Sequence, residues 1–245
     1  MMTNLVRSMT QHEQLNFLLT NRVPRRYLTR LMGWYSRIES RPLTRLSISV
    51  WKLFADDINL SEAKEKTFDS LHECFIRELK DGARTVDQDE NIITSPCDAI
   101  VGASGEINGT TVYQAKGFPY ELADLISDKS LQEKYRDGVY VTLRLKSSMY
   151  HRFHAPVDCE VKHVDYISGD TWNVNPIALK RIEELYCKNE RAVVELETGD
   201  SGKSILMVPV AAILVASMRF HCLKQDLDLK YQGPNRLTCD ARYRK

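Results

Sequence analysis

Two histidines, His151 and His154, stand close together in the segment Tyr150-His-Arg-Phe-His-Ala-Pro-Val-Asp158. An imidazole gains or loses a proton near neutral pH, so a histidine that lines a cleft is a natural general acid or base. Short alternations of apolar and polar residues follow, broken by proline and glycine, and they are typical of strands and tight turns. Side chains three positions apart on a strand point to opposite faces, so this pattern predicts separate tasks for the two histidines.

A metal site is an alternative use of these side chains. The spacing His151-x-x-His154 would suit two ligands on one face of a helix, but the proline at 156 argues for a strand or turn. Cys159 and His163 are further candidates only because they are near in sequence. We therefore predict no metal ion, while a purely structural role for either histidine, hydrogen-bonded inside a β core, stays open.

Asp98 is the third candidate, in Ser95-Pro-Cys-Asp-Ala99 between two apolar strand halves. A lone aspartate in a turn ordinarily accepts hydrogen bonds from its own backbone. By itself this position therefore predicts only a turn, and a catalytic role needs a second line of argument.

That second line is a resemblance. The run Tyr150–Asp158, followed by Gly169-Asp-Thr-Trp-Asn-Val-Asn-Pro176, resembles the signature of the phosphatidylserine decarboxylases. The likeness extends from about Tyr27 to Ser217, with its other strong parts at 95–101, 113–118 and 189–191. It implies an enzyme that converts phosphatidylserine to phosphatidylethanolamine and CO₂. The reaction would run through a Schiff base to a pyruvoyl group, which the protein makes by cutting itself at a serine.

The resemblance also implies roles for the three candidates. Asp98 matches the acid, and His154 the base, of an Asp–His–Ser relay in which the serine hydroxyl attacks the preceding carbonyl. His151 matches a histidine near the pyruvoyl and substrate, where it would stabilise the substrate or protonate the carbanion left by CO₂. Ala99 departs from the glycine usual in the family, which matters only if that turn needs a positive φ.

The serine itself is missing from this sequence. None of the eleven glycines precedes a serine; Gly109-Thr110 is the nearest equivalent, and Ser217 has no preceding glycine. The resemblance implies that the chain stops, at Lys245, about where the serine-bearing strand should begin, and that a smaller serine-derived subunit completes the enzyme. The rivals are a non-catalytic phospholipid-binding relative without pyruvoyl and a generic β binding module. A pyridoxal phosphate enzyme is not favoured, since no glycine-rich phosphate loop is present.

Charge is spread unevenly along the chain. Residues 1–52 contain nine Lys or Arg against two Glu, a balance of +7, whereas the whole chain carries +1. A basic amino-terminal part predicts an anionic surface as partner, and we expect a peripheral protein on the cytosolic face of a membrane, the inner membrane if bacterial. The most apolar run, 205–218, is too short to cross a bilayer.

The six cysteines lack CxxC spacing, which predicts reduced thiols, and no motif indicates nucleic acid. A homodimer is possible.

The periodicity predicts an α+β protein: a predominantly β, sandwich-like body of short antiparallel strands behind amphipathic helices. We expect a helical membrane-associating segment over 1–60 and a decarboxylase domain over 61–245. Expected helices lie at 24–38, from about Pro42, at 67–80 with a capping box at Ser70 and Glu73 and a solvated His72, at 120–136 and at 177–188. Expected strands lie at 92–102, 105–113, 138–145, 192–197 and 204–215, with a hairpin turn at Asn108-Gly109. The apolar stripes of the first two helices either pack on the domain or form a basic anchor in a lipid headgroup layer.

Overall fold

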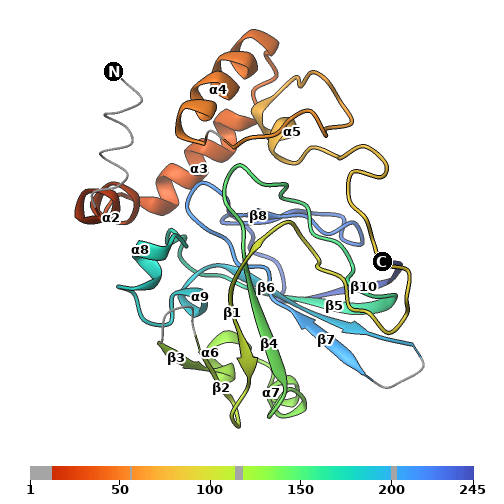
Figure 1. Ribbon diagram of the computed structural model, residues 1–245. Coiled ribbons are helices and arrows are strands. Elements are labelled where there is room, and N and C mark those ends of the chain that lie inside the picture. Colours follow the sequence, from red (N-terminus) through yellow and green to blue (C-terminus); the bar gives the residue numbers. More distant parts are fainter. Residues whose placement is uncertain (1–12, 56, 114–117, 200–202) are drawn as a thin grey trace.

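The amino-terminal helices lie on one side of the molecule and the strands on the other (Figure 1). The computed structural model describes residues 13–55, 57–113, 118–199 and 203–245. The likeness at 113–118 falls, apart from its two end residues, outside these ranges. Helices and short antiparallel sheets alternate along the chain, which confirms the α+β class. The division at about residue 60 stays a prediction.

From residue 13 on, the described amino-terminal part contains the helices α2 (Glu13–Asn21), α3 (Arg25–Ser36) and α4 (Arg41–Phe54). The helices predicted over 24–38 and from about Pro42 are confirmed. Pro42 occupies the first turn of α4, where a missing backbone N–H leaves no hydrogen bond unmade. The buried residues of α3 and α4 are Thr29 and Thr44. Most of the apolar stripe of α4 is exposed and does not pack on the other described residues, in contrast to the alternative in which these helices pack on the domain.

The helix predicted over 67–80 is much shorter than expected, because α5 covers only Leu71–Phe75. Residues 78 and 80 instead exchange backbone hydrogen bonds with 62 and 64 in an extended arrangement, which ends the helix. Half of the predicted capping box is present: the Ser70 hydroxyl accepts from the Glu73 N–H, but the Glu73 carboxylate accepts from the N–H of Asp69. His72 is half-buried, so the prediction of a solvated ring is wrong.

The largest sheet has the antiparallel order β10-β5-β6-β7. Its strands are β5 (Cys159–Ile167), β6 (Arg191–Glu197), β7 (Ser204–Met207) and β10 (Arg236–Tyr243). The strand expected over 204–215 therefore ends at Met207, two residues before a proline that cannot donate to the ladder. Within the described residues β7 and β10 are the edges of this sheet.

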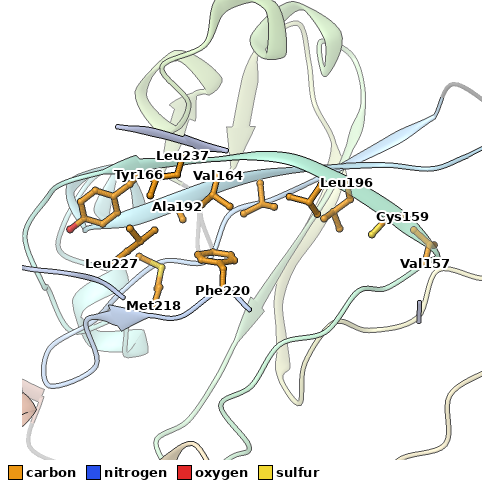
Figure 2. Packing of buried hydrophobic residues seen from close by; sticks show 12 residues of the cluster. Val157, Cys159, Val164, Tyr166, Ala192, Leu196, Met218, Phe220, Leu227 and Leu237 are labelled. Atoms are coloured by element: carbon orange, nitrogen blue, oxygen red, sulfur yellow. The ribbon is translucent and has the colours of Figure 1, made fainter. Parts of the chain in front are cut away.

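Both faces of the central strand β6 are buried. Neighbouring residues of β6 belong to different cores: Val193 packs with Ile126 and Leu185, whereas Val194 packs with Val164 and Leu227. Figure 2 shows the second core, in which Met218, Phe220 and Leu227 lie against the side chains of β5 and β6. The short strands β8 (Ser217–Met218) and β9 (Leu227–Asp228) pair at the ends of this covering segment.

Two smaller antiparallel pairs complete the strands. β1 (Ile100–Glu106) pairs with β4 (Val139–Arg144), and β2 (Thr111–Tyr113) pairs with β3 (Pro119–Glu121). The turn at Asn108-Gly109 is confirmed: Asn108 and Thr111 exchange backbone hydrogen bonds, and Gly109 has a φ of +63°. Glycine adopts this conformation without the steric cost that a side chain would bring.

Two predicted helices are broken. In place of 120–136 the chain forms α6 (Leu122–Leu125) and α7 (Lys129–Lys134). Asp128 separates them because its carboxylate accepts from the N–H groups of residues 130 and 131 and so starts a new helix. In place of 177–188 it forms α8 (Pro176–Leu179) and α9 (Leu185–Lys188).

The prediction of reduced thiols is wrong for two of the six cysteines, because Cys222 and Cys239 form a disulfide with an S–S distance of 2.03 Å. The pairing of β10 with β5 carries Cys239 to the turn that contains Cys222. Their separation of 17 residues gives no signal in the sequence. Cys74, Cys97, Cys159 and Cys187 are free.

Candidate acid–base site

His154 lies on an irregular segment between the end of β4 and the start of β5, so the expected strand at this point is not present. Backbone hydrogen bonds fix the segment: the His154 N–H donates to the Pro96 carbonyl over 2.7 Å, and the Thr94 N–H donates to the Pro156 carbonyl over 2.9 Å. Residues 94–96 therefore run beside 154–156, and Asp98 follows two residues later. This pairing brings Asp98 and His154, which are 56 positions apart in sequence, onto neighbouring loops.

Both carboxylate oxygens of Asp98 accept hydrogen bonds from Arg84. The Nε–Oδ1 distance is 2.8 Å and the Nη2–Oδ2 distance is 2.6 Å. These bonds, followed by weaker electrostatic contributions, hold the pKa of the Asp98 carboxyl below its ordinary value, so it is ionised at neutral pH. No hydrogen bond joins the described side chains of Asp98 and His154; Asp98 acts on the imidazole through its charge. Ala99 has no positive φ, so its departure from glycine brings no strain.

The imidazole of His154 contacts a tyrosine. Its Nε2 lies 3.0 Å from the hydroxyl oxygen of Tyr150, and the two rings are nearly parallel. Although the residue is exposed, desolvation by its neighbours lowers the pKa of His154; the charges of Arg152 and His221 lower it further, and Asp98 opposes them. His154 is therefore neutral at pH 7, as a general base must be.

His151 has a different environment. Its Nδ1 lies 2.8 Å from the Met149 carbonyl and so carries the proton of this hydrogen bond, and its ring stacks on Phe75 with centroids 4.0 Å apart. Burial lowers the pKa of His151 to about 4. Phe75 in turn contacts Trp51 of α4, with centroids 6.0 Å apart. The two histidines thus have different partners, as predicted, although the segment is a loop and not a strand.

A buried cation, Arg77, lies close to Asp98 and His151. Arg77 is only 5 % exposed; its Nη1 donates to the Cys74 carbonyl over 3.3 Å, its Nη2 reaches two further carbonyls at 3.5 Å, and its Nε has no partner among the described residues. It is near enough to lower the pKa of both Asp98 and His151. A buried guanidinium with so few hydrogen bonds destabilises a fold unless an anionic group pairs with it.

Sequence reasoning found Asp98, His151 and His154 but gave no role to Arg77, Arg84 or the hydroxyl of Tyr150. Arg84 stands 14 residues before the carboxylate that it holds, and no helix or strand period links the two positions. Arg77 lies in a run that looks like an ordinary amphipathic helix. Tyr150 was visible only as part of the signature. In the described part of the chain no three His, Cys, Asp or Glu side chains gather as a metal site would require.

An ionised aspartate, a neutral histidine and a buried arginine on loops beside an antiparallel sheet define a candidate acid–base site. The chain belongs to the phosphatidylserine decarboxylase family, whose model matches residues 71–235 and so includes every residue of this site.

Named relatives agree with the family model. The chain is 36% identical over 199 residues to the phosphatidylserine decarboxylase proenzyme of Photobacterium profundum, which covers 80% of this chain and 67% of that protein. It is 37% identical over 180 residues to the proenzyme of Vibrio parahaemolyticus, covering 72% and 63%, and 36% identical over 192 residues to that of Fusobacterium nucleatum, covering 77% and 63%. The matched part thus spans about two thirds of each relative.

Proposed function

We propose that these 245 residues form the larger part of a phosphatidylserine decarboxylase, which releases CO₂ from phosphatidylserine and leaves phosphatidylethanolamine. The observation that carries the proposal is the backbone pairing of 94–96 with 154–156, because it brings the loops of the family's predicted acid and base together. The family relatives are named proenzymes, which agrees with a protein that is cut into two subunits.

Self-cleavage is the first task of the site. When a serine hydroxyl attacks the carbonyl before it, His154 takes the hydroxyl proton, and the ionised Asp98 favours the imidazolium that results. Arg84 keeps Asp98 ionised and in place. No Gly-Ser pair occurs in the 245 residues, so the serine must come from residues outside them.

Decarboxylation is the second task. The pyruvoyl group, when present, supplies the electron sink that loss of CO₂ requires. Arg77 fits this use of the site, since its Nε, which has no partner among the described residues, can donate to a carbonyl oxygen of the group or to the substrate carboxylate. His151 is half-buried and neutral, and its Nδ1 proton is donated to the Met149 carbonyl, so Nε2 is the atom that exchanges a proton with the reacting carbon.

We also propose that α3 and α4 associate with an anionic membrane on its cytosolic face. On α4, Leu46, Val50, Leu53 and Phe54 form one stripe at helical spacing and are 45–65% exposed. Trp34 of α3 is 66% exposed. Such uncovered apolar area beside basic residues is typical of a helix lying in a headgroup layer. In the described residues no helix is long and apolar enough to cross the bilayer.

The arginines of α3 are only partly available to lipid. Arg25 pairs with Asp170 over 2.6 Å and lies 3.5 Å above the ring of Trp172, and Arg30 donates to the Leu229 carbonyl over 3.1 Å. These contacts attach α3 to the segments that follow β5 and β9. The apolar stripe of α4 is therefore the better target for testing membrane binding, since changing Arg25 or Arg30 would also disturb the fold.

The decarboxylase proposal is tested by adding the serine. We expect the chain fused to the carboxy-terminal part of the Photobacterium profundum relative to cut itself and to release CO₂ from carboxyl-labelled phosphatidylserine. The 245 residues alone should release none. A folded fusion that binds phosphatidylserine vesicles but is neither cut nor active would favour the non-catalytic lipid-binding relative. CO₂ release by the 245 residues alone would mean that the electron sink is another group.

A further inference from the structure

The hydroxyl of Tyr150 is the direct partner of the His154 imidazole. Tyr150 is 7% exposed, and its hydroxyl oxygen lies 3.0 Å from His154 Nε2. A buried phenol loses free energy if its hydroxyl is unpaired. The contact between the two rings, with centroids 5.6 Å apart and an interplanar angle of 17°, fixes the imidazole from one side.

Asp98 does not orient the imidazole of His154. In an Asp–His–Ser relay the carboxylate accepts a hydrogen bond from the imidazole and so selects the tautomer. Here both oxygens of Asp98 bond to Arg84, which also bonds to Glu62 over 3.1 Å. The carboxylate can stabilise an imidazolium through its charge, but the neutral ring takes its orientation from another group.

We propose that Tyr150 is the positioning residue of His154: its hydroxyl donates to Nε2 and thereby keeps that nitrogen unprotonated, with the neutral ring protonated at Nδ1. Burial is the main cause of the raised pKa of Tyr150, so the phenol keeps the proton that it donates. The charged groups that act on the phenol are Arg152, Glu78, Asp98 and Arg77.

The consequence for self-cleavage rests on the proposed function. Nε2 is held as a lone-pair acceptor before any serine arrives, which is the state that a general base requires. A serine hydroxyl takes the place of the Tyr150 hydroxyl at Nε2. As the serine oxygen bonds to the carbonyl carbon, the π bond of that carbonyl opens and its electron pair moves to the carbonyl oxygen. The serine proton moves to Nε2, so the products are an oxyanion and an imidazolium near the negative charge of Asp98.

The tautomer can be measured on the 245-residue chain without any activity. Long-range ¹H–¹⁵N correlation spectra at pH 8 distinguish protonated from unprotonated ring nitrogens, and a His154→Gln variant assigns the signals. We expect His154 to be protonated at Nδ1 in the wild-type chain. In Tyr150→Phe we expect the signals to shift to those of mixed tautomers. The pKa of His154 should also rise by several tenths of a unit, because a hydrogen bond to the neutral ring is lost.

Three comparisons control this experiment. His151 should keep its Nδ1 proton in every variant, since it donates to a carbonyl. Tyr135→Phe removes another partly buried hydroxyl, one that donates to Ser204 over 2.7 Å, and should leave the His154 signals unchanged. Asp98→Asn should lower the pKa of His154 without changing its tautomer.

Two results would overturn the proposal: a wild-type His154 protonated at Nε2, or a Tyr150→Phe spectrum with the wild-type tautomer. The first needs no variant, so it decides the matter even if Tyr150→Phe fails to fold. The readout is a protonation state and not an activity. The proposal for Tyr150 can therefore fail while the decarboxylase proposal stands, and the decarboxylase proposal can fail while the proposal for Tyr150 stands.

Discussion

The helices α3 and α4 and the sheet β10-β5-β6-β7 use apolar residues in opposite ways. In the sheet, neighbouring residues of β6 enter two different cores, and Val164 and Leu227 are 0% exposed. On α4 the apolar stripe stays open, with Leu46 62% and Phe54 65% exposed. Similar side chains therefore stabilise the fold in one region and remain available for a partner in the other. Arg25 and Asp170 connect the two regions.

The largest effect expected from this difference is on folding stability. Leu227→Ala should lower the free energy of unfolding by about 2–5 kcal/mol, because it leaves a cavity in a closed core. The matched change Leu46→Ala should stay within about 0.5 kcal/mol, since that side chain is mostly in water. Urea unfolding followed by circular dichroism measures both. An equal loss in the two variants would show that the α4 stripe is covered in solution.

The second prediction concerns Glu190, which is fully buried beside Tyr166 of β5 and close enough to Arg26 of α3 and Asp228 of β9 to feel their charges. Burial raises the pKa of this carboxyl to about 7, and the neighbouring Tyr166 hydroxyl opposes the shift only in part. The folded state thus binds a proton that the unfolded state has released between about pH 4.5 and 7, so stability falls as pH rises through this window.

Glu190→Gln keeps the group neutral and removes this dependence. We compare the free energy of unfolding of Glu190→Gln with that of wild type at two pH values. The difference, in favour of the variant, should be up to about 3 kcal/mol larger at pH 8 than at pH 4.5. Unfolding curves at several pH values test it. Glu195→Gln is the control, because it removes a carboxyl that is less buried than that of Glu190. Parallel pH curves for Glu190→Gln and wild type would mean that the carboxyl is ionised in the fold.

The third prediction is smaller and concerns lipid. Changing Leu46, Val50 and Phe54 together to serine should weaken binding to anionic vesicles roughly thirtyfold, about 2 kcal/mol, while the unfolding curve is unchanged. Serine changes at Val101, Val139 and Val141, also exposed but on β1 and β4, are the matched control and should bind normally. Co-sedimentation with vesicles measures both, and binding should weaken as salt rises. Equal losses in the two triple variants would remove the special role of α4.

Local signals in the sequence predicted local structure well. Pro42 marked the start of α4, and Asn108-Gly109 marked a turn, because each depends on backbone preferences of one or two residues. The apolar period over 120–136 failed because the Asp128 carboxylate caps a new helix inside it. The spacing of apolar residues shows which side of a helix is buried. It does not show that a polar side chain will interrupt the backbone hydrogen bonds of that helix.

Contacts between distant segments could not be predicted in this way. The Cys222–Cys239 disulfide depends on the pairing of β10 with β5. The hydrogen bonds from Arg84 to Asp98 depend on contact between two loops. The family signature located Asp98 and the two histidines, yet it gave no information on which groups hydrogen-bond to them. That information comes only from the fold, and it moves the positioning role from Asp98 to Tyr150.

The central claim is that His154 is the base of self-cleavage and that His151 acts later. The most direct measurement is gel electrophoresis of the fusion that carries the relative's serine segment, with three variants beside the unchanged fusion. His154→Ala should leave one uncut band, and Asp98→Asn should cut much more slowly. His151→Ala should be cut normally but release CO₂ poorly. If His154→Ala is cut at the rate of the unchanged fusion, the assignment of the base is contradicted.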